Sequence, residues 1–290
     1  MKPRLLALGV AAAAFLAIAE PATVAASAPA FTTGALVPSY AGEPLPAQNA
    51  TVTSLNWAGY VVAPSRPVTS VSSSFVVPTV TSPGIAATWT GIGGYNSNDS
   101  TLIQAGVAEQ SPGSLIGPDN AWYEMLPAPE TPVTSCTYGN SSSSSTNCPV
   151  APGNKVSVSI SLASSSCSAG SPCNKWSISI ENATDGWTFQ KYVTYASSQA
   201  SAEWILEAPT LGIGPLPLGF QTVLPLMGNT DFGASYTKGA PDTWNGQSIA
   251  SGNPVTVDMV GVGPAAEGQP SGLGSNGESF VACTYSLSCS

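Results

Sequence analysis

Few side chains in this sequence could carry out acid–base chemistry, and carboxyl groups are the main ones. The 290 residues include no histidine, which excludes a Ser–His or Cys–His couple and a histidine general base. Glu124, Glu203 and Glu207 lie within apolar, strand-like patterns, where an unpaired carboxylate is costly. These three glutamates are therefore the first candidates for a functional site.

Glu203 and Glu207 fall on one face of the predicted strand 201–207, because side chains alternate along a strand. Four residues separate their Cα atoms by about 13 Å. The two carboxyl groups of a glycosidase lie roughly 5–9.5 Å apart. The spacing therefore argues against a glycosidase pair formed by these two alone. Either one of them is catalytic and the other structural, or both are structural.

An amide and three indoles extend the set of candidates. Gln104 shares a strand face with Leu102 and Gly106, and the missing side chain at Gly106 would suit the close approach of a ligand. Three tryptophans are followed by small or flat residues, a pattern that also lines grooves for peptides or sugars; they are Trp57, Trp89 and Trp122. A core glutamine and core tryptophans are the competing interpretation.

The composition narrows the class of protein. Only 8% of residues are charged, against roughly 25% in an ordinary soluble domain, and the formal net charge is −9. Seven basic residues are too few for a nucleic-acid footprint, whereas 43% hydrophobic residues can bury a core. Without histidine or a C-x-x-C motif, we expect no metal and no cofactor.

The N-terminus predicts export. Lys2 and Arg4 precede an apolar run over 5–19 that is shorter than the roughly 20 residues of a membrane span, and small residues follow. We expect residues 1–30 to be a signal peptide and the protein to be secreted, with no membrane attachment after its removal. Residues 31–52, rich in Ala, Pro, Thr and Gly, are expected to be a pro-segment or a flexible leader.

An oxidising compartment would allow the six cysteines to form disulfides. Six cysteines permit 15 connectivities, of which we prefer the sequence-local one. That pairing joins Cys136 to Cys148, Cys167 to Cys173 and Cys283 to Cys289.

The pattern of residues 53–290 indicates strands nearly throughout and predicts one all-β domain, an antiparallel two-sheet β-sandwich. The segment 155–162 alternates Val, Ile and Leu with Ser, and 176–192 has the pattern of a hairpin. The apolar, Pro- and Gly-containing stretch 211–228 is expected to be a covering flap or a packed loop. Further strands are predicted at 56–62, 71–77, 86–92, 101–109, 121–126, 201–207, 231–237, 254–260 and 279–286.

Seven short strings, taken in order, resemble those of the glutamic peptidases (eqolisins, peptidase family G1), a family of secreted acid endopeptidases. Each string is weak alone, but their co-occurrence in the family's order is specific. The strings are Asn56–Gly59, Thr88–Gly94, Leu102–Val107, Ala121–Glu124, Glu181–Thr184, Ala202–Glu207 and Asp231–Gly233.

The resemblance implies a sandwich of the concanavalin A-like or jelly-roll type with a catalytic Gln–Glu dyad on one concave sheet face. By their positions in the motifs, the dyad is Gln104 and Glu207, not Glu203. It also implies a secreted zymogen, and we expect a monomer that acts on protein or peptide substrates. The residues that would line the substrate cleft are Trp57, Gly59, Trp89, Gly94, Trp122 and Glu124.

The sequence departs from the family pattern at several cleft positions. Gly93 and Asn120 stand where fungal members carry Asp, and Met125 and Leu126 replace an aromatic pair. We expect these departures to alter subsite preference and pH optimum more than the chemistry.

Two other classes compete with the peptidase. One is a carbohydrate-active or carbohydrate-binding sandwich, in which Glu124 and Glu207 could form a cross-strand pair. The other is a non-catalytic sandwich, in which Gln104 and Glu207 would be buried and distant. Independently of class, the absence of histidine and the scarcity of charge predict a body that stays folded in acid.

Overall fold

The computed structural model describes residues 31–33, 37, 46, 48–96, 98–114, 117–139, 141, 143–164, 171–172, 174–213, 216–233, 241–261, 266–286 and 288–289. The predicted signal peptide lies outside the described residues, as does much of the predicted leader. Within the described part of the chain, no helix has the length and apolar character needed to cross a membrane.

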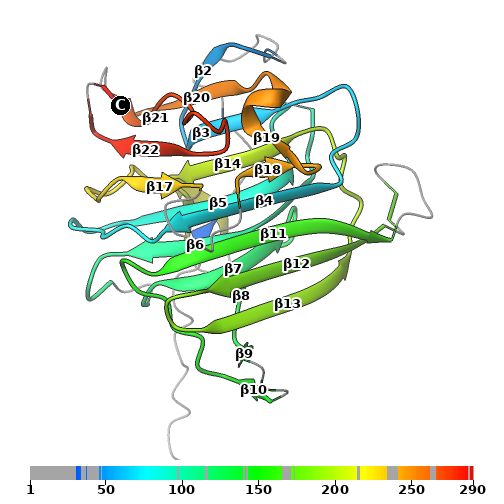
Figure 1. The fold of residues 1–290 in the computed structure, drawn as a ribbon. Coiled ribbons are helices and arrows are strands. Elements are labelled where there is room, and N and C mark those ends of the chain that lie inside the picture. Colours follow the sequence, from blue (N-terminus) through cyan, green and yellow to red (C-terminus); the bar gives the residue numbers. More distant parts are fainter. Residues whose placement is uncertain are drawn as a thin grey trace, which may run out of the picture.

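Two layers of strands form a β-sandwich (Figure 1). The layer that carries the candidate residues, called here the site layer, runs β7 (Asn120–Met125), β6 (Leu102–Gln110), β5 (Ile85–Gly93), β14 (Ala202–Glu207), β3 (Trp57–Val62) and β20 (Val255–Val260). The facing layer runs β13 (Trp187–Thr194), β12 (Lys175–Asn182), β11 (Lys155–Ser164) and β4 (Ser70–Val76).

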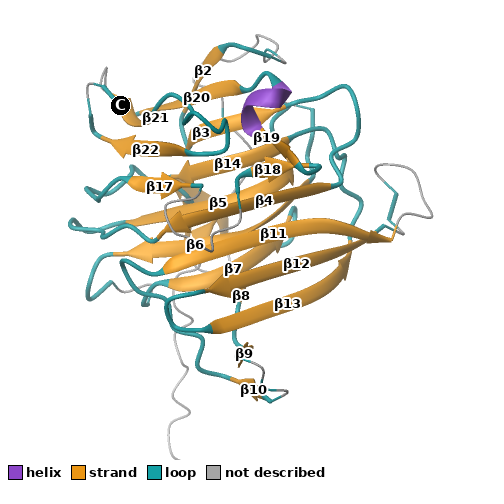
Figure 2. Ribbon diagram, viewed as in Figure 1, coloured by secondary structure: helices purple, strands orange, loops and turns teal. Residues whose placement is uncertain are grey.

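One side of the sandwich is closed by strands that link the two layers. β21 (Ala266–Pro270) and β22 (Phe280–Thr284) follow β20 in the ladder, and β17 (Thr230–Phe232) joins β22 to β4. β2 (Thr51–Ser54) adds to β20 as a parallel strand. A helix occurs in the described residues only as the single 3-10 turn η1 (Ile249–Gly252; Figure 2). The remaining short strands are β8 (Thr131–Pro132), β9 (Cys136–Tyr138), β10 (Ser144–Ser145), β18 (Thr243–Trp244) and β19 (Gln247–Ser248).

A separate three-stranded sheet contains the first described residues of the chain. β1 (Phe31–Thr32) pairs with β15 (Thr210–Ile213), and β15 pairs with β16 (Leu216–Gln221). The sequence predicts a flap or loop for 211–228, and the structure instead forms paired strands over half of it, at 211–213 and 216–221. Proline and glycine in this stretch obscure the alternation by which strands are recognised.

The site layer is buried on both of its faces, which explains its nearly continuous apolar sequence. Between the two layers, Ile103 and Val107 of β6 pack in one cluster with Ile160 of β11 and Ile178 of β12. On the opposite face of the same layer, a second apolar cluster gathers residues of β3, β5, β6, β7 and β14. The largest side chains of that second cluster are Trp57, Trp89, Trp122, Leu102 and Ile205.

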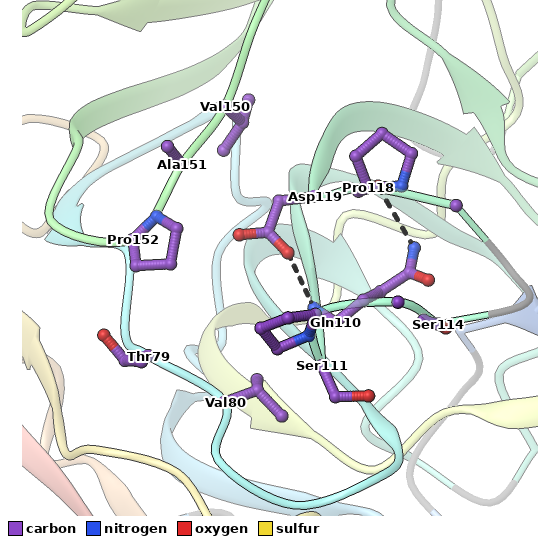
Figure 3. Close-up of a pocket in the computed structure, with 13 residues that line it drawn as sticks. Thr79, Val80, Gln110, Ser111, Ser114, Pro118, Asp119, Val150, Ala151 and Pro152 are labelled. Atoms are coloured by element: carbon purple, nitrogen blue, oxygen red, sulfur yellow. Dashed lines mark hydrogen bonds between the residues drawn. The ribbon is translucent and has the colours of Figure 1, made fainter.

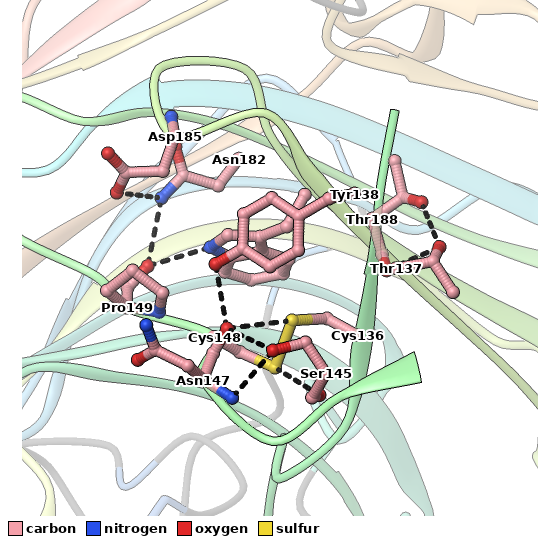
Figure 4. The surroundings of a disulfide bond; sticks show 11 residues. Cys136, Thr137, Tyr138, Ser145, Asn147, Cys148, Pro149, Asn182, Asp185 and Thr188 are labelled. Carbon is pink, nitrogen blue, oxygen red and sulfur yellow. Dashed lines mark hydrogen bonds between the residues drawn. A yellow bond between two sulfur atoms is a disulfide. The ribbon is translucent and has the colours of Figure 1, made fainter. Parts of the chain in front are cut away.

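Two of the three predicted disulfides are confirmed. Cys136 and Cys148 are bonded across the β9–β10 region, and Cys283 and Cys289 are bonded near the C-terminus. Around the first, Tyr138 Oη donates to the Asn147 carbonyl at 2.7 Å (Figure 4). The third predicted couple, Cys167 and Cys173, lies outside the described residues.

Candidate active site

The candidate residues gather on the face of the site layer that carries the three tryptophans. Strand register sets this arrangement, because cross-strand partners project to the same side of a sheet. Gln104 of β6 lies opposite Gly91 of β5 on one side and opposite Glu124 of β7 on the other. Glu207 of β14 pairs with Trp57 of β3. These side chains are buried, since none of Gln104, Glu124, Glu207 and Trp57 is more than 1% exposed.

Gln104 and Glu124 form one half of the site, together with a residue of the leader. Gln104 Nε2 donates to Glu124 Oε2 at 2.6 Å and to the Thr33 hydroxyl at 2.9 Å. The Thr33 hydroxyl in turn donates to Glu124 Oε2 at 2.6 Å. The Gln104 amide is thus oriented by Glu124, and Thr33 lies directly against it.

Glu124 is a neutral acid throughout the acidic range. Burial is the largest effect and raises the pKa of Glu124 to about 8. The hydrogen bonds from Thr33 and Gln104 lower the pKa by less than burial raises it, and the charge of Glu130 raises it slightly further. A neutral carboxyl group can both accept from the Gln104 amide and keep a proton of its own.

Glu207 forms the other half of the site with two neutral donors. Trp89 Nε1 donates to Glu207 Oε2 at 2.7 Å, and Asn56 Nδ2 donates to Oε1 at 3.3 Å. Asn56 is itself held, because its Oδ1 accepts from the Ser54 hydroxyl and from the backbone N–H of Val37, both at 2.9 Å. The carboxyl group therefore has a fixed orientation.

Trp89 is fixed from a second direction. Its ring meets that of Trp57 edge-on, with centroids 5.0 Å apart and an interplanar angle of 76°. The indole that donates to Glu207 is thus packed as well as hydrogen-bonded.

The strand register gives the positions of the two halves relative to each other. Residues that lie opposite one another on neighbouring strands form a row across the sheet. Gln104, Gly91 and Glu203 lie in one such row, whereas Glu207 lies in the row of Ala87 of β5. The rows are four residues apart, or about 13 Å along the strands, and the row of Trp89 lies between them. The structure therefore joins Gln104 to Glu124 and Glu207 to Trp89, with the indole between the two halves.

Glu203 lies two strands from Gln104, across a glycine. It is fully buried, and burial raises its pKa well above the ordinary value, against a smaller lowering by Ser201 and with a further rise from Asp99. Burial therefore favours the neutral form of this carboxyl group, and Glu203 differs from Glu207 in lacking the indole donor.

Glu124 and Glu207 do not form a close carboxyl pair. Three strand spacings separate β7 from β14, which is about 14 Å, and Glu207 is also displaced along the strands. Glycosidase carboxyl groups lie roughly 5–9.5 Å apart. The strand order thus removes the cross-strand pair on which the carbohydrate-active alternative depends.

The glycines of the motifs serve the packing of the layer. A Cβ on Gly59, whose φ is +150°, would lie 2.0 Å from the Trp204 carbonyl oxygen, and a Cβ on Gly94, at φ +87°, would press on Leu102. The expectation that Gly106 leaves room for a ligand is wrong, because a Cβ there would lie 2.6 Å from Trp89 Cβ and still closer to a backbone carbonyl. Gly106 instead allows Trp89 to pack.

Two residues that contact the candidate catalytic groups, Asn56 and Thr33, were not predicted from the sequence. Asn56 belongs to the first recognised string, but only its neighbours Trp57 and Gly59 are proposed as cleft residues. Thr33 carries no sequence signal, since one threonine in a small-residue leader resembles any other. In the part of the chain that the structure describes, no group of three potential metal ligands occurs.

A separate cavity of about 470 Å³ lies at the far end of β6 (Figure 3). Thr79, Gln110 and Pro152 are among its lining residues, and Asp119 Oδ1 there accepts the Gln110 N–H at 2.7 Å. Six residues, about 20 Å of strand, separate Gln110 from Gln104. This cavity is distinct from the candidate site.

Comparison with known proteins agrees with the motifs. The family model described as the Peptidase A4 family matches residues 55–258. A search of curated proteins found no match.

Solved structures of this family share the fold. A scytalido-glutamic peptidase with a transition-state analogue inhibitor superposes with a TM-score of 0.59 at 18% identity, over 80% of this chain and 98% of that one. SCP-B, a member of the eqolisin family in complex with the tripeptide Ala-Ile-His, gives 0.55 at 18% identity over the same shares. The family match covers more than half of the chain, so this chain belongs to the Peptidase A4 family, the glutamic peptidases or eqolisins.

Proposed function

We propose that this glutamic peptidase is a secreted, acid-acting endopeptidase in which Glu207 is the general base and acid and Gln104 stabilises the oxyanion. The observation that carries the proposal is the orientation of the two groups by dedicated neighbours. Trp89 and Asn56 hold the Glu207 carboxyl group, and Glu124 holds the Gln104 amide. Gln104 and Glu207 are buried and lie in rows four residues apart, as the non-catalytic alternative also expects, so the casein assay described below decides between the two.

The chemistry proceeds without imidazole. Ionised Glu207 takes a proton from a water molecule, which attacks the scissile carbonyl, and later returns the proton to the leaving nitrogen. The Gln104 Nε2–H₂ donates to the developing oxyanion, and among the described residues Gln104 Oε1 has no hydrogen-bond partner. A glutamate with an ordinary pKa of about 4.3 is a usable base in mild acid, where histidine would be protonated.

Residues 31–52 are proposed to be a pro-segment that covers the site before activation. Thr33 contacts Gln104 and Glu124, and Val37 contacts Asn56. Farther along, Tyr95 donates from Oη to the Pro46 carbonyl at 2.7 Å. A leader that touches both halves of the site blocks access to them. The two disulfides and the predicted signal peptide support secretion of this form.

Acidification of the purified full chain tests the function and the pro-segment together. At pH 3, with pepstatin present to suppress aspartic peptidases, we expect cleavage within or at the end of residues 31–52 and then digestion of casein. N-terminal sequencing and acid-soluble peptide release report the two events. Digestion of a glycan panel with no release from casein would contradict the proposal.

Asn56 is predicted to position Glu207 rather than to react. Replacing it by Ala removes the donor to Glu207 Oε1 and keeps the hydrogen bond from Trp89 to Oε2. We expect kcat to fall roughly tenfold, as for loss of about one hydrogen bond to a charged group, with KM nearly unchanged. Steady-state kinetics on a fluorogenic peptide measure the split.

Asn56→Asp is the matched comparison, because it keeps the side-chain size but places a second carboxyl group beside Glu207. A neighbouring like charge disfavours ionisation, so this variant is expected to shift the acidic limb of the kcat profile to higher pH. An unchanged pH profile, or a rise in KM alone, would assign Asn56 a purely structural role.

A further inference from the structure

The strand β15, beside the site, pairs with β16 along one edge and with β1 along the other. β15 follows Glu207 within three residues, and its inner edge pairs with β16. Its other edge pairs antiparallel with β1, with Phe31 opposite Leu211 and Thr32 opposite Thr210. β1 is two residues long and belongs to the predicted pro-segment. It thus occupies the edge as an added strand, the binding mode of β-augmentation.

The direction of the backbone groups on this edge follows from one hydrogen bond. The Thr222 N–H donates to the Pro209 carbonyl at 3.2 Å, so the carbonyl group of Pro209 points toward the side of β16. In an antiparallel ladder, successive residues direct their N–H and C=O groups to opposite sides. Thr210 therefore presents both groups to β1, where its partner is Thr32. Phe31, one residue earlier, directs its own backbone groups away from β15.

The residue after this paired segment reaches the candidate catalytic groups. Thr33 follows β1 directly, and its hydroxyl accepts from Gln104 Nε2, the same donor that we assign to the oxyanion. In a strand that pairs with β15 in the register of β1, the residue that follows the paired segment therefore lies against Gln104.

We propose that this edge is the main-chain docking site for peptide substrates, which bind as an extended strand antiparallel to β15 in the register now held by β1. The proposal rests on the peptidase function proposed above and adds where the substrate backbone lies. The residue of the substrate at the Thr32 position exchanges its N–H and C=O with Thr210. The next residue is presented to Gln104.

Such docking has a consequence for specificity. Recognition through the backbone tolerates many side chains, but proline at the Thr32 position is excluded, because it has no N–H for the Thr210 carbonyl. Proline at the Phe31 position is tolerated by the ladder, since the N–H of that residue points away. The two neighbouring positions therefore form a matched pair for a test.

The first experiment displaces β1 from β15 in the full-length chain. All variants carry Glu207→Gln, so that the added peptide is not cleaved. Thr32→Pro is added to displace β1, and Phe31→Pro is the control. The probe is a fluorescein-labelled peptide with the sequence of residues 29–38, PAFTTGALVP. Fluorescence anisotropy is expected to show at least about tenfold tighter binding to the Thr32→Pro chain than to the Phe31→Pro chain.

The second experiment alters the probe instead of the protein. On the Thr32→Pro chain, N-methylation of the peptide at its Thr32 amide is expected to weaken binding about tenfold, and N-methylation at its Phe31 amide is expected to leave it unchanged. Equal binding to the two proline variants, or equal effects of the two methyl groups, would overturn the docking proposal. Binding is read without turnover, so failure of the peptidase proposal, seen as no casein digestion by the wild-type chain, is distinguished.

Discussion

Glu207→Gln is expected to abolish peptide hydrolysis, with kcat lower by about 10²- to 10⁴-fold, because the amide cannot take a proton from water. The change is nearly isosteric and keeps an oxygen to accept from Trp89 Nε1. Gln104→Ala is expected to cost about 10²- to 10³-fold, the usual effect of removing one oxyanion donor. Fluorogenic peptide turnover at pH 4 measures both, and an unchanged melting temperature shows that the fold persists.

Glu203→Gln is the matched control for this assignment. Glu203 lies on the same strand and in the row of Gln104, and it is already neutral in acid because burial raises its pKa. Replacing its carboxyl group by an amide is therefore expected to leave turnover within about twofold of the wild type. Loss of activity in the Glu203 variant together with full activity in the Glu207 variant would transfer the role of base to Glu203.

The second large effect concerns stability and pH, and its direction is opposite to ordinary acid denaturation. Burial raises the pKa of Glu124 to about 8 and raises the pKa values of Glu109, Glu203 and Asp242 well above their ordinary range. Between about pH 4.5 and these folded-state values, the native chain binds more protons than the unfolded chain. The free energy of unfolding therefore falls as pH rises through this window, and the contribution of these groups is fully present below their ordinary pKa values of 4.5 for Glu and 3.8 for Asp.

The size of this effect follows from proton linkage. Each such carboxyl group contributes a slope of about 1.4 kcal/mol per pH unit within its own window. Glu124 alone would account for roughly 3 kcal/mol between pH 4.5 and pH 7.5. For a domain of this size, we expect the melting temperature to be at least about 6 °C higher at pH 4.5 than at pH 7.5. Calorimetry on the Glu207→Gln chain, which does not process itself, measures the difference.

Asp242→Asn isolates one group of this set. Asp242 Oδ1 accepts from the Ser74 N–H at 3.1 Å, and asparagine preserves that contact. The variant is expected to show a shallower dependence of melting temperature on pH, because it lacks one titrating group. A melting temperature that falls when the Glu207→Gln chain is taken from pH 7.5 to pH 4.5 would refute the account.

Period-two alternation predicted the strands of this fold well where one face is polar, as in β11 and β12. The buried site layer was located largely by its motifs, because β5, β6 and β14 are apolar on both faces. The composition predicts stability in acid from the scarcity of charge, and the structure adds a second physical reason, because burial raises the pKa values of Glu109, Glu203 and Asp242.

Tertiary contacts explain what the sequence could not provide. Strings of residues identify Gln104 and Glu207 as a proposed pair, but only the register shows that Trp89 lies between their rows. Thr33 becomes meaningful through a contact with Gln104 across 71 residues of sequence. The β15–β16 hairpin depends on pairing between distant segments in a stretch whose prolines and glycines resemble a loop.

If residues 31–52 are the pro-segment proposed above, the attachment of Thr33 to the same chain as the site makes activation depend on the dilution of the protein. Thr33 and Thr51 are eighteen positions apart, and a segment joined by so short a linker competes at an effective concentration in the millimolar range. A single cut between them turns the resident strand into a free peptide at the concentration of the protein itself, which is far lower in a dilute exterior. Activation is therefore expected to be one-way outside the cell and self-limiting in a confined space.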